Sequence, residues 1–210
     1  IPIKKVKIIR NIFKKNKKKK SDYFNIIYAG NIGEAQDLKS LISHLNQDKK
    51  ILRKMIERKI KIMIYGSGSQ LFFIKKILEK DKFKKEGLIS KVFSYEGLTS
   101  REEIFAKFSN ADCLLLNLGL YNSLSMVVPT KIFEYCATPL PIIYNASGFT
   151  KNFIMGIDGT IHFDKFEPQS FFNAIKKSRN MVVDADKRTK FLKIFDSDLI
   201  YKKFAKHLFD

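Results

Sequence analysis

The chain has 210 residues, of which 45% are hydrophobic and 29% charged, and its formal net charge at pH 7 is +19. This balance predicts one globular domain with a sizeable core and excludes a second full domain. No apolar run is long enough to span a membrane, and the start shows no signal-peptide pattern. Cys113 and Cys136 lie in apolar segments, so we expect buried, reduced thiols and a cytoplasmic protein.

More than half of the net charge lies in residues 1–20, which contain nine lysines and Arg10 but no acidic residue. Apolar residues recur there at near-helical spacing: Ile3, Val6, Ile9 and Phe13. This pattern is typical of a helix that lies on an anionic membrane surface, but basic runs also occur in linkers and in nucleic-acid-binding tails. We therefore interpret residues 1–22 as a basic segment, either amphipathic or an interdomain linker. No nucleic-acid-binding module is recognisable, so we expect no nucleic-acid partner.

Hydrophobic runs alternate with helical patterns through residues 23–196. The predicted strands are residues 24–30, 61–65, 92–99, 111–117, 142–144 and 159–163. The last predicted helices are residues 168–178, 185–195 and 197–208. Repeated strand–helix units predict an α/β fold with a single, doubly wound parallel sheet of the Rossmann-like type. Residues 197–210 form a separate C-terminal helix in this scheme.

Glycine turns follow the first two predicted strands. Gly30 and Gly33 follow the first strand, and Gly66-Ser67-Gly68 follows the second. Such turns let the backbone approach a ligand closely. The second turn imitates a dinucleotide fingerprint, but Leu71 replaces its third glycine, and the next acidic candidate, Glu86, lies in a lysine-rich loop. These differences disfavour a nicotinamide dinucleotide.

A helix with a capping box is predicted after the third strand, because Ser100 precedes Glu103 by three residues. The three histidines lack the spacing of metal ligands or of a catalytic triad, and we expect them to be structural or solvated: His44, His162 and His207.

The most informative stretch is residues 129–141. Pro129 suits the first turn of a helix, and prolines at 139 and 141 end it. In an α/β sheet the start of such a helix lies beyond the strand ends, where its free N–H groups can hold a phosphate. Thr130 and Lys131 are placed to reinforce that site, and Glu134 to accept hydrogen bonds from a ribose or sugar hydroxyl. The alternative is an ordinary amphipathic helix with a solvated Lys131–Glu134 pair.

The sequence Pro-Thr-Lys-Ile-Phe-Glu-Tyr at 129–135 resembles the Pro-Ser-Lys-x-x-Glu-Tyr signature of group 1 (family 4) retaining glycosyltransferases, in their bacterial surface-polysaccharide branch. Three other segments are similar to that family, in the same order: the donor-domain opening at 28–36, the base-recognition loop at 95–100 and Ala-Asp-x-x-Leu at 111–115. The resemblance covers about residues 24–200. It implies the C-terminal, donor-binding half of a GT-B fold.

The resemblance also implies a ligand and its binding residues. The ligand is a nucleotide-diphosphate sugar, with a UDP-sugar favoured, and no cofactor or metal is implied. Lys131 is implied to stabilise the leaving diphosphate. The implied donor-binding residues are Gly30, Asn31, Gly33, Gln36, Gly66, Gly68, Tyr95, Gly97, Leu98, Thr99, Thr130, Lys131 and Glu134.

Four positions depart from the family pattern. Asn31 and Gln36 replace an Arg and a Lys that contact the donor diphosphate in the wider family, and Met126 replaces a glutamate that faces the sugar. Pro139 replaces the glycine that usually ends the helix, so the helix must end differently here.

Two functions remain open at this point. The first is the donor-binding domain of a retaining glycosyltransferase in capsule, O-antigen or exopolysaccharide synthesis, which needs an N-terminal acceptor domain in the same chain or in a partner. The second is a non-catalytic, degenerate module that binds a membrane surface or a partner through its basic face. The expected location is the cytoplasm, or the inner face of the plasma membrane.

Overall fold

The structure is a computed structural model that describes residues 2–16 and 20–209. Its centre is a parallel sheet of six strands in the order β3-β2-β1-β4-β5-β6. The prediction of a single, doubly wound, Rossmann-like sheet is confirmed. The strands are β1 (Phe24–Ala29), β2 (Ile60–Tyr65), β3 (Phe93–Gly97), β4 (Cys113–Asn117), β5 (Ile142–Asn145) and β6 (Thr160–His162).

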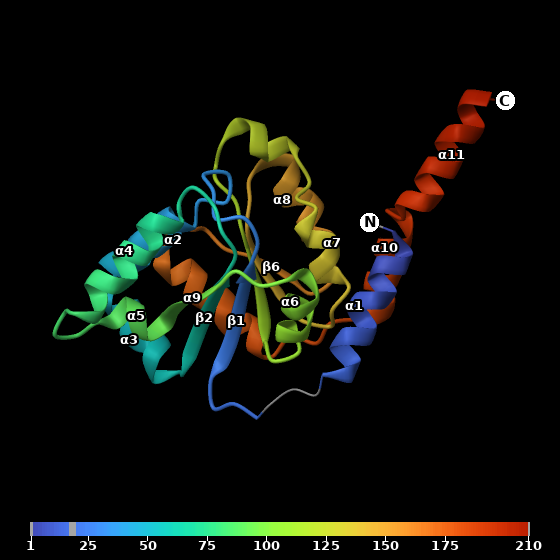
Figure 1. Ribbon diagram of the computed structural model, residues 1–210. Coiled ribbons are helices and arrows are strands. Elements are labelled where there is room, and N and C mark those ends of the chain that lie inside the picture. The colour runs from blue at the N-terminus through green and yellow to red at the C-terminus, as the bar shows by residue number, and fades with distance from the viewer. Residues whose placement is uncertain (1, 17–19, 210) are drawn as a thin grey trace.

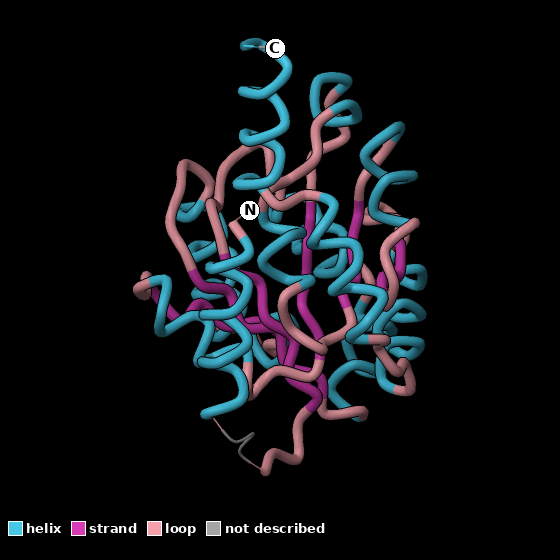
Figure 2. The backbone as a smooth tube through the Cα atoms, turned by 90° about the vertical axis from the view of Figure 1, so that its right-hand side faces the viewer, coloured by secondary structure: helices cyan, strands magenta, loops and turns pink. Residues whose placement is uncertain are grey.

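Helices cover both faces of this sheet (Figures 1 and 2). One face carries α2 (Leu38–Gln47), α3 (Lys49–Glu57), α4 (Leu71–Lys82), α5 (Leu88–Val92) and α9 (Pro168–Arg179). The other face carries α1 (Ile3–Lys15), α6 (Arg101–Phe108), α7 (Lys131–Cys136), α8 (Gly148–Met155) and α10 (Ala185–Ile194). A 3-10 helix, η1 (Asn122–Met126), precedes α7, and α11 (Ser197–Phe209) ends the described chain.

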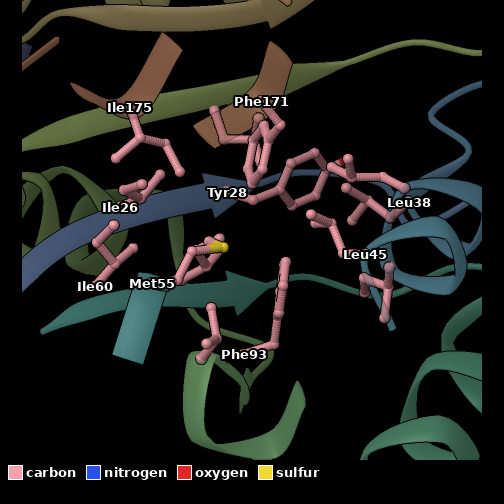
Figure 3. Packing of buried hydrophobic residues seen from close by; sticks show 14 of the residues in the cluster. Ile26, Tyr28, Leu38, Leu45, Met55, Ile60, Phe93, Phe171 and Ile175 are labelled. Carbon is pink, nitrogen blue, oxygen red and sulfur yellow. The ribbon is translucent and has the colours of Figure 1, made fainter. Parts of the chain in front are cut away.

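Side chains of the strands alternate between two hydrophobic cores, one on each face. In β1, Ile26 and Tyr28 belong to the first core, whereas Ile27 and Ala29 belong to the second. Figure 3 shows the ring of Tyr28 beside Phe171 of α9 and Leu38 of α2. Since both faces of the sheet are covered, the fully buried strands β4 and β5 read as nearly continuous apolar runs in the sequence.

Helix α1 packs against the domain instead of presenting its apolar face outward. Val6 and Ile9 are fully buried in the second core, next to residues of α6. The predicted apolar stripe is therefore not available to a lipid surface while α1 is packed, because the same side chains fill the protein core. The side chain of Ile3 lies outside the described residues. The lysines of the opposite face remain exposed, among them Lys4, Lys7 and Lys14.

Helix α11 projects away from the rest of the molecule in both views (Figures 1 and 2). Its side chains from Asp198 to Lys206 are exposed, including Leu199, Tyr201 and Phe204. None of the helices in the described part of the chain combines the length and the apolar character that crossing a membrane requires.

Several boundaries differ from the predictions. The predicted helix at 129 begins at Lys131 and ends at Cys136, where the Thr138 hydroxyl donates to the Tyr135 carbonyl at 2.8 Å. This bond replaces the missing glycine cap. Helices α3, α5 and α8 were not predicted; α5 has only five residues, and α8 opens with a glycine. The Ser100–Glu103 capping box is confirmed.

Candidate functional site

Two neighbouring hollows open at the carboxyl edge of the sheet, where the strand order reverses between β1 and β4. The first has a volume of about 380 Å³ and lies above the ends of β1 and β2, next to the starts of α6 and α7. The second has a volume of about 300 Å³ and lies above the ends of β1 and β4. Ala29, Gly30, Asn31 and Lys131 line both hollows. In open α/β sheets this is the usual position of a ligand site.

The hollows bring together many of the sequence-predicted site residues. The first is lined by Gly30, Asn31, Gly66, Leu98, Thr99 and Lys131, and the second by Gly30, Asn31, Gln36, Thr130 and Lys131. Gly33, Gly68, Tyr95, Gly97 and Glu134 line neither hollow. These five lie behind the walls or in the adjoining turns.

The glycine turns contact each other directly. The Gly30 N–H donates to the Tyr65 carbonyl at 3.1 Å, and the Ile32 N–H donates to the Ser67 carbonyl at 2.7 Å. An ideal Cβ atom on Gly66 would lie 1.8 Å from the carbonyl oxygen of Gly30. The second glycine turn is therefore required for close packing of the two loops.

The turn after β3 supports this arrangement from behind. The Tyr95 hydroxyl donates to the Gly66 carbonyl at 3.0 Å, and the Gly66 N–H donates to the Gly97 carbonyl at 3.0 Å. Tyr95 and Gly97 thus shape the wall, while Leu98 and Thr99 face the first hollow.

Lys131 lies over the first glycine turn. An ideal Cβ atom on Gly30 would lie 3.5 Å from Cε and 4.0 Å from Nζ of Lys131. A cation thus sits at the boundary of the two hollows, against backbone that has no side chain. The position suits contact with an anionic ligand.

Glu134 is buried, with 4% of its surface exposed, and three cations surround its carboxylate. Lys5 Nζ lies 2.7 Å and Arg101 Nη2 2.5 Å from Oε1, and Lys131 Nζ lies 3.1 Å from Oε2. The Lys131–Glu134 pair expected of an ordinary amphipathic helix is present, but its carboxylate is not solvated. Lys5 comes from α1 and Arg101 begins α6, so three distant segments meet at one carboxylate.

The balance of burial and charge keeps Glu134 ionised. Burial favours the neutral acid, but the hydrogen bond from Lys5, the charge of Lys131 and the hydrogen bond from Arg101 outweigh it and lower the pKa of Glu134 to about 2. The Glu134 oxygens face cations in this structure, so its predicted contact with a ribose hydroxyl stays a prediction.

Tyr135 links β1 and β4, the two strands between which the strand order reverses. Its buried hydroxyl lies 3.2 Å from the Ala29 nitrogen, whose N–H donates to it, and 3.3 Å from the carbonyl oxygens of Ala29 and Leu115. Helix α7 is thereby tied to the end of β1 and the middle of β4. This explains the tyrosine that closes the 129–135 motif.

Amides line the second hollow where the wider family carries charges. Asn31 Nδ2 donates to Gln36 Oε1 at 2.9 Å, so the two replacements bind each other. Asn117 Nδ2 donates to the carbonyls of Gln36 and Asp37 at 2.7 and 3.2 Å, which leaves its buried Oδ1 without a partner among the described residues. Met126 is largely exposed in η1.

Four residues of the site were not predicted: Lys5, Arg101, Asn117 and Tyr135. Arg101 could have been found, because it is the first basic residue of a helix that starts at the ligand-binding edge. Lys5 lies 129 residues from Glu134 in the sequence, and no local pattern links them.

The histidines have structural contacts. His44 Nδ1 lies 2.7 Å from the Ser40 carbonyl oxygen, and His162 Nε2 lies 3.2 Å from that of Ala146. The His207 side chain lies outside the described residues. Within 2–16 and 20–209, no group of three or more His, Cys, Asp or Glu side chains is arranged to hold a metal ion.

The sequence matches no protein-family model and no curated protein. The fold, in contrast, is similar to many solved structures. HepE from Anabaena, in complex with UDP and glucose, matches with a TM-score of 0.68 at 12% identity over 99% of this chain and 54% of HepE. TarM, from S. aureus, matches with a TM-score of 0.59 at 16% identity over 92% of this chain and 37% of TarM.

A third structure is itself a single domain. The C-terminal domain of the glycosyl transferase group 1 family protein LpcC from Francisella tularensis matches with a TM-score of 0.54 at 16% identity, over 93% of this chain and 92% of that domain. The chain thus spans about a third to a half of the longer proteins and nearly all of the isolated domain. It has the Rossmann-like fold of a GT-B glycosyltransferase C-terminal domain.

Proposed function

We propose that this chain is the donor-binding domain of a retaining glycosyltransferase that uses a nucleotide-diphosphate sugar, with a UDP-sugar favoured. The observation that carries the proposal is the pair of hollows joined at Gly30, Asn31 and Lys131. Its support is the likeness of 99% of the chain to part of HepE, which binds UDP and glucose. In this arrangement the nucleoside occupies the first hollow, the diphosphate the shared boundary and the sugar the second hollow.

Lys131 supplies the chemistry that this half can offer. Bond breaking in the donor places additional negative charge on the leaving diphosphate, and a cation fixed at that point stabilises the transition state more than the ground state. Helix α7 has only six residues, so the side-chain charge rather than the helix dipole carries this role. Thr130 lines the second hollow beside Lys131 and is placed to orient the donor.

The proposed pathway is the synthesis of a bacterial surface polysaccharide, as the 129–135 motif implies. The acceptor site belongs to an N-terminal domain, either in the same polypeptide or in a partner. The proposed location is the cytoplasm or the inner face of the plasma membrane. Residues 1–210 alone are expected to bind the donor but to transfer no sugar.

Calorimetric titration tests the proposal. The chain is titrated with UDP, GDP and their sugars, and the same titration is run on Lys131→Ala. Saturable binding of one nucleotide, weakened in the variant, is expected. If none of these nucleotides binds, the donor role is wrong.

One observation favours the alternative of a non-catalytic module. The positions that carry diphosphate-binding charges in the wider family hold Asn31 and Gln36, and these two amides bind each other. Such a module would bind anionic vesicles through the exposed lysines of α1 and would not bind nucleotides. Replacing Lys4, Lys7 and Lys14 with glutamine tests this in vesicle co-sedimentation, since it leaves the buried residues of α1 in place.

A further inference from the structure

The site contains a second cation that the sequence motifs do not assign. Arg101 lines the first hollow together with Lys131, and both bind the buried carboxylate of Glu134. We propose that Arg101 binds the diphosphate of the donor beside Lys131, and that Glu134 is the positioning residue that holds these cations together. This inference rests on the proposed function and names the residues that perform it.

The charges of the cluster fit a diphosphate. Lys5, Arg101 and Lys131 contribute three positive charges around the single negative charge of Glu134. The cluster thus has an excess of two positive charges next to a hollow of about 380 Å³. The diphosphate of a nucleotide-diphosphate sugar carries two negative charges at neutral pH, which equals this excess.

The exposure of the cations differs in a way that assigns their roles. The side chain of Arg101 is 66% exposed and that of Lys131 32%, whereas the carboxylate that they share is buried. Lys5 binds the same Glu134 oxygen as Arg101 but lines neither hollow. Arg101 contacts Glu134 through Nη2, so its other N–H groups can face a phosphate while the contacts of Arg101 and Lys5 with Glu134 are both kept.

Arg101 also compensates for the amides at positions 31 and 36, which carry no charge. Without basic residues at these positions, Lys131 alone would face the diphosphate from the glycine-turn side. A guanidinium offers several N–H donors in a planar fork that matches phosphate oxygens. Arg101, at the start of α6, therefore supplies from the neighbouring helix the charge that Asn31 lacks.

The test compares Arg101→Gln with Arg53→Gln. Arg53 is an exposed arginine that also binds one carboxylate, that of Glu86 at 2.8 Å, so both variants lose one charge and one ion pair. Uridine, UMP and UDP are titrated calorimetrically into each protein. We expect Arg101→Gln to weaken the binding of UDP about 10- to 100-fold, because a charge-assisted hydrogen bond is lost. The affinity for uridine should not change. Arg53→Gln should bind UDP with the affinity of the wild type.

A double-mutant cycle tests the positioning role. Glu134→Gln is expected to weaken UDP binding in the wild-type background. It should weaken UDP binding much less in the Arg101→Gln background, because the two residues act through one contact. Equal UDP affinity in wild type and Arg101→Gln would overturn the assignment of Arg101 while leaving the donor site intact. Absence of UDP binding in the wild type would overturn the proposed function and this assignment together.

Discussion

An alanine Cβ atom cannot be accommodated at Gly66, because it would lie 1.8 Å from the carbonyl oxygen of Gly30. The backbone of Gly66 also has φ of +134°, a conformation that residues with side chains rarely adopt. The turns after β1 and β2 can therefore approach each other only with glycine at this position.

Gly66→Ala is expected to destabilise the fold by about 1–3 kcal/mol or more, since the two loops must separate. Urea denaturation followed by circular dichroism measures the change. Gly156→Ala is the matched control, because Gly156 has φ of −73° and a methyl group added there would lie 3.5 Å from its nearest neighbour. Similar losses in both variants would contradict the role given to the Gly66–Gly30 contact.

Tyr135→Phe is expected to lower the free energy of unfolding by about 1–3 kcal/mol. The variant keeps the ring but removes the hydroxyl that binds the end of β1 and the middle of β4, so the buried Ala29 N–H loses an acceptor. Thermal denaturation checks this against Tyr201→Phe, since Tyr201 is largely exposed on α11. Unchanged stability of Tyr135→Phe would mean that the hydroxyl does not tie α7 to the sheet.

The strands in the middle of the sheet could be predicted from the sequence, because they are buried on both faces. The run at 113–117 illustrates this, since its side chains alternate between the two cores and all are apolar up to Asn117. The capping box at Ser100 could be predicted for a different reason. It depends on residues three positions apart, and such local hydrogen bonds require no tertiary context.

Only part of the charge cluster around Glu134 could be predicted from the sequence. The Lys131–Glu134 pair follows from helical spacing, but the burial of Glu134 depends on α1 and α6, which reach it from residues 5 and 101. The packing of α1 also bears on the alternatives left open for residues 1–22. Val6 and Ile9 form an apolar stripe that suits lipid and protein equally, and only the tertiary structure shows that the domain core takes it.

Glu134 makes the stability of the fold depend on pH. Its pKa is about 2 in the folded protein, against an ordinary value of 4.5, so the folded state favours the ionised form. The resulting stabilisation is fully present above about pH 4.5 and is lost as the pH falls toward 2. At about 1.4 kcal/mol per pKa unit it is on the order of 3 kcal/mol.

Urea unfolding of wild type and Glu134→Gln between pH 2 and pH 7 measures this contribution. The difference in free energy between the two proteins isolates Glu134, because the other acidic groups are common to both. We expect the difference to be largest near pH 7 and to shrink below pH 4.5. A difference that does not vary with pH would show that the carboxylate charge is not what Lys5, Arg101 and Lys131 bind.

Lys165 forms a buried ion pair that supports the second hollow. Its ammonium, with only 1% of the side chain exposed, binds Asp37, which follows Gln36 and has a left-handed backbone with φ of 45°. The carbonyl groups of residues 36 and 37 accept the hydrogen bonds that orient Asn117. Removing the ammonium leaves the Asp37 carboxylate poorly paired, and loss of one partner of a buried pair costs about 3–5 kcal/mol.

Lys165→Met is therefore expected to lower stability by several kcal/mol, less than the full range because Asp37 is partly exposed. Lys165→Met combined with Asp37→Asn should recover part of that loss, since asparagine removes the unpaired charge and tolerates the left-handed conformation. Denaturation of the single and double variants measures the coupling. If the second substitution adds to the first instead of compensating for it, the ion pair is not what holds this loop to the segment that follows β6.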